Sequence, residues 1–145
     1  MKAESRFGDL TELRDDRMRG KDNQWVRPHP GPFVWNNIEK EKGIFYWDKA
    51  DEYVTYAQNH NQTTIATIWP YSNWEQKSCK RKKGRSPFGK RFTKYLSKPC
   101  SMESYEKFLL ALVDRYDGDG INDMPNLTKP ITQTHTIIVK SRKSG

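Results

Sequence analysis

Five side chains that could hold a polar, ring-shaped ligand follow two β-prone stretches of the sequence. They are Arg27, His29, Trp69, Tyr71 and Trp74. Guanidinium and imidazole groups form hydrogen bonds with polar substituents, and aromatic faces stack on rings. In α/β proteins, ligands bind beyond the carboxyl ends of the strands. The sequence therefore predicts a binding site at these five residues, which we call the predicted rim.

Two strands and a helix are expected to position the predicted rim. Residues 25–27 form a short β-prone run that ends at a proline. Residues 63–69 are rich in β-branched side chains without polar alternation, which favours a strand covered on both faces, as in a parallel sheet. Between them, with Asp48 as the expected N-cap, helical spacing relates Ala50, Tyr53, Val54 and Ala57. The pattern predicts a right-handed βαβ unit.

The flanking segments contribute one strong helix and several weaker elements. Residues 33–47 form an aromatic-rich connection, with a helical turn expected at 35–40 that Gly43 ends. Ser101 is expected to begin an amphipathic helix that covers a sheet, with the apolar stripe Met102, Tyr105, Phe108, Leu109, Leu112, Val113 and Tyr116. Residues 1–24 are charged and poorly defined and show no strand pattern, whereas residues 132–145 contain a divergent strand and a polar tail.

The composition is that of one domain whose core depends on aromatic residues. Only 34% of the 145 residues are hydrophobic, but 12% are aromatic, including five Trp and seven Tyr. No stretch approaches the length of a membrane span, and the first ten residues have no apolar segment typical of a signal peptide. We therefore expect neither membrane insertion nor an export signal in the chain as written.

The net charge of +8 comes from one segment, residues 77–98. This segment holds ten basic residues and no acidic one, so the rest of the chain is slightly acidic. The cations are interleaved with Phe88, Phe92 and Tyr95, which could stack on the bases of a single-stranded nucleic acid. The segment matches none of the usual nucleic-acid-binding motifs, and charge runs are usually solvated. A basic insertion loop is the favoured interpretation, and nucleic-acid binding is the alternative.

Several short motifs allow more than one interpretation. Cys79 and Cys100 bracket the basic loop, so a disulfide that closes this loop is possible. Metal and catalytic roles are disfavoured, because the cysteines have no metal-ligand spacing and no neighbour that would activate a thiol. Residues 117–123 place carboxylates at alternate positions, but an EF-hand would need Arg115 as its first ligand, so a turn is favoured over a calcium site. We expect no metal or cofactor. Two glycosylation sequons begin at Asn61 and Asn126.

Four stretches in a fixed order resemble a known group of enzymes. They read WVRPHPGPFVWNNIE (25–39), GIFYWDKAD (43–51), IWPYSNWEQ (68–76) and KPCSMESY (98–105), leading into VDRYDGDGINDMP (113–125). Together they resemble the amino-terminal half of (β/α)8-barrel retaining glycoside hydrolases of the β-galactosidase, xylosidase and cellulase-like clan. The resemblance covers residues 25–131. It implies a partial TIM barrel of about three parallel strands with two main amphipathic helices, and a carbohydrate substrate.

The resemblance also assigns roles to some residues. Arg27 matches the strand-end arginine that supports the nucleophile, and His29, Trp69 and Trp74 match positions that line the sugar cleft. Glu39 and Glu75 also match family positions, but we assign neither a catalytic role.

The residues that perform the reaction have no counterpart. In the family, the strand that follows a segment like 124–131 carries the acid/base glutamate, but residues 132–139 contain no Glu. The nucleophile lies further along the family's sequence. Retaining hydrolysis needs both carboxyl groups, so residues 1–145 alone are expected to be inactive. A truncated gene product, with 132–145 read in a shifted frame, is favoured over a short protein completed by a partner. A noncatalytic carbohydrate-binding remnant is a further alternative.

Overall fold

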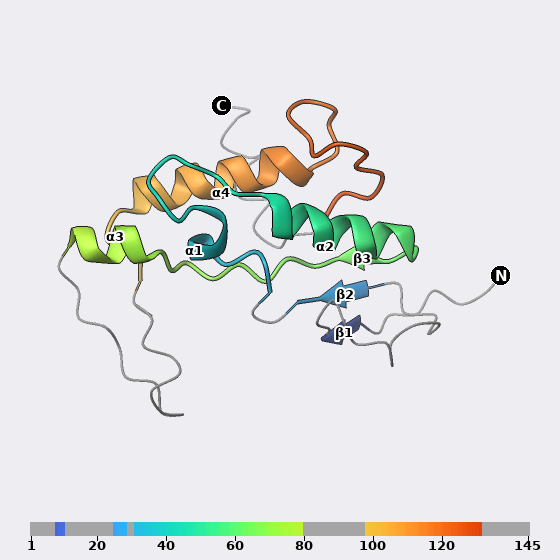
Figure 1. Cartoon of the computed structure of the whole chain (residues 1–145), viewed down its shortest axis with the longest axis horizontal. Helices are drawn as coiled ribbons and strands as arrows, with labels where there is room; N and C mark the ends of the chain where they lie inside the picture. Colours follow the sequence, from blue (N-terminus) through green and yellow to red (C-terminus); the bar gives the residue numbers. More distant parts are fainter. Residues whose placement is uncertain (1–7, 11–24, 29–30, 80–97, 132–145) are drawn as a thin grey trace, which may run out of the picture.

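The computed structural model describes residues 8–10, 25–28, 31–79 and 98–131. Three short strands, β1 (Gly8–Leu10), β2 (Trp25–Arg27) and β3 (Thr63–Thr64), form a parallel sheet in the order β1-β2-β3 (Figure 1). Val26 lies opposite Asp9 on one side and opposite Thr64 on the other. The helices are α1 (Trp35–Ile38), α2 (Asp48–Asn59), α3 (Asn73–Ser78) and α4 (Met102–Tyr116). The predicted mixed α/β class is confirmed.

Strand β1 corrects the expectation that residues 1–24 contain no strand. Its three residues, Gly-Asp-Leu, have neither β-branched side chains nor a useful alternation. They are extended because they pair with β2 along its free edge. Strand formation here depends on a tertiary partner rather than on local preference, which explains why the sequence pattern gave no signal.

Helix α2 connects β2 to β3 and makes the two strands parallel. Its buried residues are the four that helical spacing predicted: Ala50, Tyr53, Val54 and Ala57. The expected N-cap is wrong by one position, because Trp47 is the N-cap and Asp48 is the first helical residue. Asp48 and Asp51 both lie in the first turn, where a negative charge interacts favourably with the helix dipole and stabilises the helix.

Helix α4 begins where the sequence predicted. The Ser101 hydroxyl oxygen accepts a hydrogen bond from the Ser104 backbone N–H at 3.1 Å and so caps the helix. The buried members of the predicted stripe are Phe108, Leu112, Val113 and Tyr116. Met102 was wrongly placed in that stripe. It is 64% exposed because it is the first residue of the helix and no other described segment covers it.

Aromatic rings are the largest buried side chains of the core between the helices. Trp35 stacks on Phe108 with 5.6 Å between ring centroids, and Phe33 meets Tyr116 edge to face at 6.0 Å. All four side chains are fully buried. Such pairs contribute about 0.5–1.5 kcal/mol each beyond the burial of their area. Phe33 lies just before α1 and Trp35 is its first residue. Helix α4 therefore packs on this connecting segment as well as on α2.

A polar network ties α4 to the start of α2. Arg115 donates two hydrogen bonds to the Asp51 carboxylate, one of them from Nε at 3.0 Å, and the Tyr116 hydroxyl donates to the same carboxylate at 2.7 Å. The hydrogen bond with Asp51 raises the pKa of Arg115. Burial, followed by the hydrogen bond with Asp51, raises the pKa of Tyr116. The guanidinium also lies over the Trp47 ring, 5.3 Å from its centroid.

The strand predicted over residues 63–69 is shorter in the structure. Only Thr63 and Thr64 belong to β3, and the chains meet again at an isolated parallel bridge between Val34 and Trp69. From the Val26–Thr64 pair to this bridge, the segment after β2 advances by eight residues, to Val34, whereas the segment after β3 advances by five, to Trp69. The extra residues leave the sheet as a loop, which interrupts the ladder.

Gly31 allows this loop to return to the sheet. Its φ of +68° lies in the left-handed region, and a Cβ at this position would come within 2.3 Å of the Pro28 side chain. Further along, the predicted turn after the sheet is confirmed as α1 but ends at Ile38. Gly43, with φ of +80°, follows in the next turn.

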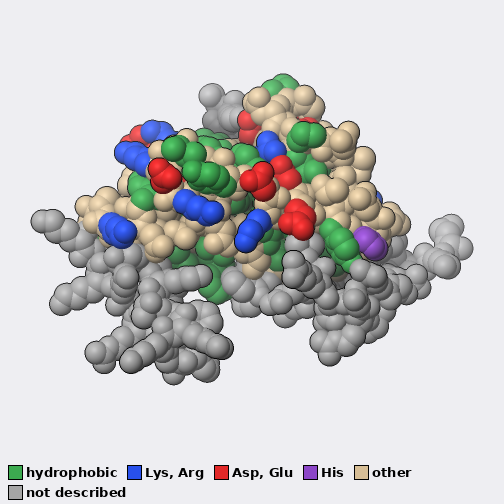
Figure 2. Space-filling model, in the orientation of Figure 1, with side chains coloured by type: hydrophobic (Ala, Val, Ile, Leu, Met, Phe, Trp, Pro, Cys, Tyr) green, Lys and Arg blue, Asp and Glu red, His purple; other side chains and the backbone are tan. Residues whose placement is uncertain are grey.

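The described surface is mixed in charge. Figure 2 shows Lys and Arg side chains interspersed with Asp and Glu on the visible face, without a broad area of one sign. Among the described residues, no helix combines the length and apolar character needed to cross a bilayer.

Candidate ligand-binding site

Trp69 and Tyr71 form the part of the predicted rim that the backbone holds most directly. The Trp69 carbonyl accepts a hydrogen bond from the Trp35 N–H at 3.0 Å, and the Tyr71 carbonyl accepts one from the Asn36 N–H at 2.7 Å. The two rings meet edge to face, with centroids 5.8 Å apart. Both side chains are half-buried. They therefore form a fixed aromatic pair that is still reached by solvent.

Arg27 lies further back along the sheet. It is the last residue of β2 and its side chain is exposed. Since Val26 lies opposite Thr64, Arg27 is level with Ile65, four residues before Trp69. An extended chain covers roughly 13 Å over four residues, so Arg27 and the aromatic pair mark two ends of an elongated edge. His29 lies outside the described residues.

Trp74 is oriented by contacts within the protein. Its Nε1 donates a hydrogen bond to the main-chain oxygen of Glu39 at 3.1 Å, and its ring meets Trp35 edge to face at 5.8 Å. The side chain remains partly exposed and lines a pocket of about 590 Å³, to which Trp69 and Tyr71 do not contribute. The structure thus places the four described rim residues in three separate locations.

The pocket beside Trp74 was not expected from the sequence. Its walls come from the turn after α1, from α3 and from the start of α4: Glu39, Lys42, Gly43, Phe45, Trp74, Ser101, Glu103, Ser104 and Lys107. Glu103 and Lys107 form an exposed ion pair at 2.7 Å. Lys107 lowers the pKa of the Glu103 carboxyl, and Glu103 raises the pKa of Lys107. A pocket with aromatic walls and with charged groups of both signs is suited to binding a small polar molecule. Trp74 was the only sequence signal for this pocket.

Glu39 borders the pocket but is committed to the fold. It is only 5% exposed, and its carboxylate accepts hydrogen bonds from Trp35 Nε1 at 2.5 Å and from the Gly43 N–H at 2.7 Å. Its main-chain oxygen accepts from Ser72 Oγ and Trp74 Nε1. A carboxylate with both oxygens bound in this way is placed to orient its neighbouring groups.

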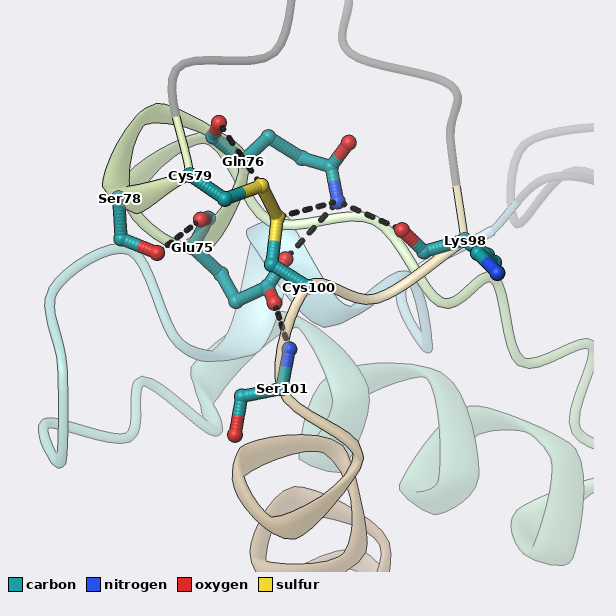
Figure 3. Close-up of a disulfide and its surroundings, with 7 residues drawn as sticks. All are labelled: Glu75, Gln76, Ser78, Cys79, Lys98, Cys100 and Ser101. Carbon is teal, nitrogen blue, oxygen red and sulfur yellow. Dashed lines mark hydrogen bonds between the residues drawn. A yellow bond between two sulfur atoms is a disulfide. The ribbon is translucent and has the colours of Figure 1, made fainter.

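The second buried carboxylate, Glu75, lies beside a disulfide (Figure 3). Its oxygens accept hydrogen bonds from Gln76 Nε2 at 2.8 Å and from the Ser101 N–H at 2.7 Å. Cys79 and Cys100 are joined, with their Cα atoms 6.1 Å apart, so the disulfide that the sequence allowed is confirmed. The bond fixes the end of α3 to the segment that leads into α4. Neither cysteine is then free to bind a metal or to act as a nucleophile.

The acidic turn after α4 is held by hydrogen bonds from its own backbone. Asp123 accepts from the Gly118 and Gly120 N–H groups, and Asp119 accepts from the Ile121 N–H. Oxygens of Asp117, Asp119 and Asp123 lie within 4.8 Å of one another. The Asx hydrogen bonds support the turn interpretation, which needs no ion.

Most of the basic loop, residues 80–97, lies outside the described residues, and so do residues 132–145. The nucleic-acid interpretation of this loop therefore stays a prediction, as does the C-terminal strand. Comparison of the chain with protein-family models, curated proteins and solved structures finds no match.

Proposed function

We propose that residues 25–131 are the amino-terminal part of a (β/α)8-barrel glycoside hydrolase that acts on O-glycosyl bonds of a carbohydrate. The observation that carries the proposal is the parallel order β1-β2-β3, with α2 between the second and third strands and α4 after the third. In such a barrel, each strand is followed by a helix and lies parallel to its neighbour. β1 strengthens the proposal, because it supplies a strand before β2.

The residues at the strand ends support a sugar as the ligand. Trp69 and Tyr71 offer half-buried aromatic rings in a fixed arrangement, and Trp74 lines a pocket with polar walls. Aromatic faces bind the C–H faces of sugar rings, while neighbouring polar groups bind the hydroxyls. Arg27, exposed at the end of β2, would contact the ligand or a carboxylate supplied by a later strand.

The carboxylates of the chain support the expectation that residues 1–145 by themselves do not cleave glycosides. Retaining hydrolysis uses two carboxyl groups about 5–5.5 Å apart. The buried carboxylates of the described residues, Glu39 and Glu75, each have both oxygens bound to protein donors. The sequence contains no Asn-Glu pair of the kind that carries the family's acid/base. This part of the barrel would bind and orient the substrate, and later strands would supply the two catalytic carboxyl groups.

Affinity electrophoresis of residues 1–145 in gels that contain soluble β-glycans tests the binding proposal. We expect one class of polysaccharide to retard the protein, and we expect Trp69→Ala to abolish the retardation. Tyr46→Ala is the control, because Tyr46 is an aromatic residue that solvent reaches, 39% accessible, but lies outside the predicted rim. Equal retardation of both variants, or none for any glycan, would contradict carbohydrate binding.

An assay with aryl glycosides tests the predicted inactivity. We expect no hydrolysis by residues 1–145, and cleavage by the purified monomer would refute the assignment of chemistry to later strands. Nucleotide sequence beyond codon 131 provides a second test, since the proposal expects codons for Asn-Glu in one of the three frames. If no frame contains them, the fragment proposal fails even where sugar binding succeeds.

A further inference from the structure

The asparagines of two sequons, Asn61-Gln62-Thr63 and Asn126-Leu127-Thr128, lie in turns of the structure. Both asparagine side chains are exposed. Asn61 and Asn126 have φ values of 58° and 59°, in the left-handed region that asparagine tolerates better than most residues. A bulky group on either amide would extend into solvent without displacing the core.

The two turns contact each other at the carboxyl end of α2. Gln58, in the last turn of α2, donates from Nε2 to the Asn126 carbonyl at 2.8 Å and accepts from the Thr128 N–H at 3.0 Å. Lys129 donates to Asn61 Oδ1 at 2.5 Å. Within the described residues, the Nδ2 atoms of both asparagines have no hydrogen-bond partner. The two acceptor nitrogens are therefore available on one corner of the molecule.

The disulfide gives an independent indication of where the chain matures. Disulfides form and persist in oxidising compartments and are rare in the cytosol. The Cys79–Cys100 bond is therefore typical of a protein that matures in an oxidising compartment, although the first ten residues show no export signal. Asn-X-Thr sequons are modified in that same setting, where they mark surface loops.

We propose that Asn61 and Asn126 are acceptors for N-linked oligosaccharides. The donor would be an oligosaccharide linked through a pyrophosphate to a polyprenyl lipid. The amide nitrogen Nδ2 forms a bond to the anomeric carbon, the bond from that carbon to the pyrophosphate oxygen breaks, the amide loses one proton, and the lipid pyrophosphate leaves. The amide oxygen is unchanged, so Asn61 Oδ1 still accepts the hydrogen bond from Lys129.

The location of these acceptors leaves the candidate ligand site open. They lie where α2 ends beside β3, whereas α3 and the disulfide lie at the opposite end of the long axis (Figure 1). Two glycans at this corner would cover the end of α2 and leave the pocket beside Trp74 accessible. The inference goes beyond carbohydrate hydrolysis and does not depend on it.

The test compares glycan occupancy of the full chain in two settings. Protein purified from its own cells is treated with peptide N-glycosidase, and peptide mass spectrometry then detects conversion of Asn61 and Asn126 to Asp. In parallel, the chain is directed into the secretory pathway of insect cells. There, Thr63→Val and Thr128→Val destroy one sequon each while keeping a β-branched side chain, and Thr63→Ser and Thr128→Ser keep the sequons as controls.

We expect two electrophoretic shifts that collapse on glycosidase treatment. Each Val variant loses one shift and the double variant loses both, whereas the Ser variants keep both. Occupancy is measured in cell-associated and secreted protein, because transfer to the nascent chain does not require complete folding. Unmodified Asn61 and Asn126 in the protein from its own cells would overturn the proposal. Shifts that persist in the double Val variant would also overturn it.

Discussion

Reduction of the Cys79–Cys100 bond is expected to lower the free energy of unfolding by about 3 kcal/mol. The two cysteines are separated by 21 positions in the sequence, and the magnitude follows from the loss of chain entropy when a loop of this length is closed in the unfolded state. The estimate does not depend on new contacts in the native state. It therefore predicts a change in stability with little change in structure.

The native geometry should survive reduction because other bonds hold both ends of the loop. Gln76 Nε2 donates to the Lys98 carbonyl at 3.1 Å, and the Ser101 N–H donates to Glu75 at 2.7 Å (Figure 3). These bonds join the same two segments as the disulfide. Trp74 is held separately by its hydrogen bond to Glu39, so its environment should also be retained.

Urea unfolding followed by tryptophan fluorescence, with and without a reducing agent, measures the effect. The double variant Cys79→Ser/Cys100→Ser is the control, since its unfolding should match that of the reduced protein and should not respond to the reducing agent. Without urea, the emission spectra of the oxidised and reduced proteins should coincide. These comparisons separate an effect on the unfolded chain from a rearrangement of the folded one.

Three results would refute this reasoning. Two thiols that react with an alkylating agent in the unreduced, unfolded protein would show that the bond is not formed. A loss of less than about 1 kcal/mol would mean that chain entropy is not the main contribution. A shifted emission spectrum without urea would mean that the hydrogen bonds at the loop ends depend on the disulfide.

Three further predictions concern the buried polar groups. Glu39→Gln should destabilise the fold by about 1–3 kcal/mol, measured by urea unfolding, because it leaves one donor, such as the Trp35 indole, without its acceptor. Asp51→Asn should cost about 2–3 kcal/mol in the same assay, because it removes the charge that pairs with the partly buried Arg115; Asp48→Asn, at an exposed position of the same helix turn, is the control. The raised pKa of Tyr116 means that folding favours its protonated form, so the contribution of this residue to stability should be constant below pH 10.0, the ordinary tyrosine value, and should be lost above it; Tyr116→Phe should reduce the alkaline loss of stability, and equal slopes of stability against pH above 10.0 would contradict the prediction.

The helices were predictable because their signals are local. The spacing of Ala50, Tyr53, Val54 and Ala57 was sufficient to identify the buried face of α2, and Ser101 was sufficient to locate the start of α4. The strands were less predictable because their extent depends on partners. β1 is a strand only because β2 lies beside it, and β3 ends early because the loop around Gly31 takes its partner away.

The candidate site was only partly predictable for a related reason. Residues at strand ends can be read from the sequence, and Trp69 and Tyr71 do meet in the structure. The pocket beside Trp74 could not be inferred, because its walls come from segments some 60 residues apart, from Glu39 to Lys107, that meet only through tertiary packing. The disulfide could be proposed from its position around the basic loop, but only the fold brings the two cysteines together.

The two buried glutamates give the proposed function its sharpest structural constraint. Glu39 binds Trp35 through its carboxylate and Trp74 through its carbonyl, so its effect on a ligand must pass through the orientation of these rings. Glu75 accepts a hydrogen bond from the Ser101 N–H, in the segment that leads into α4, and does not itself line the pocket. Both side chains are buried, and removing either carboxylate would leave buried donors unpaired, at about 1–3 kcal/mol for each group. A complete enzyme built on this scaffold would therefore take its two reacting carboxyl groups from other strands, and Glu39 would affect binding through the two tryptophans that it holds.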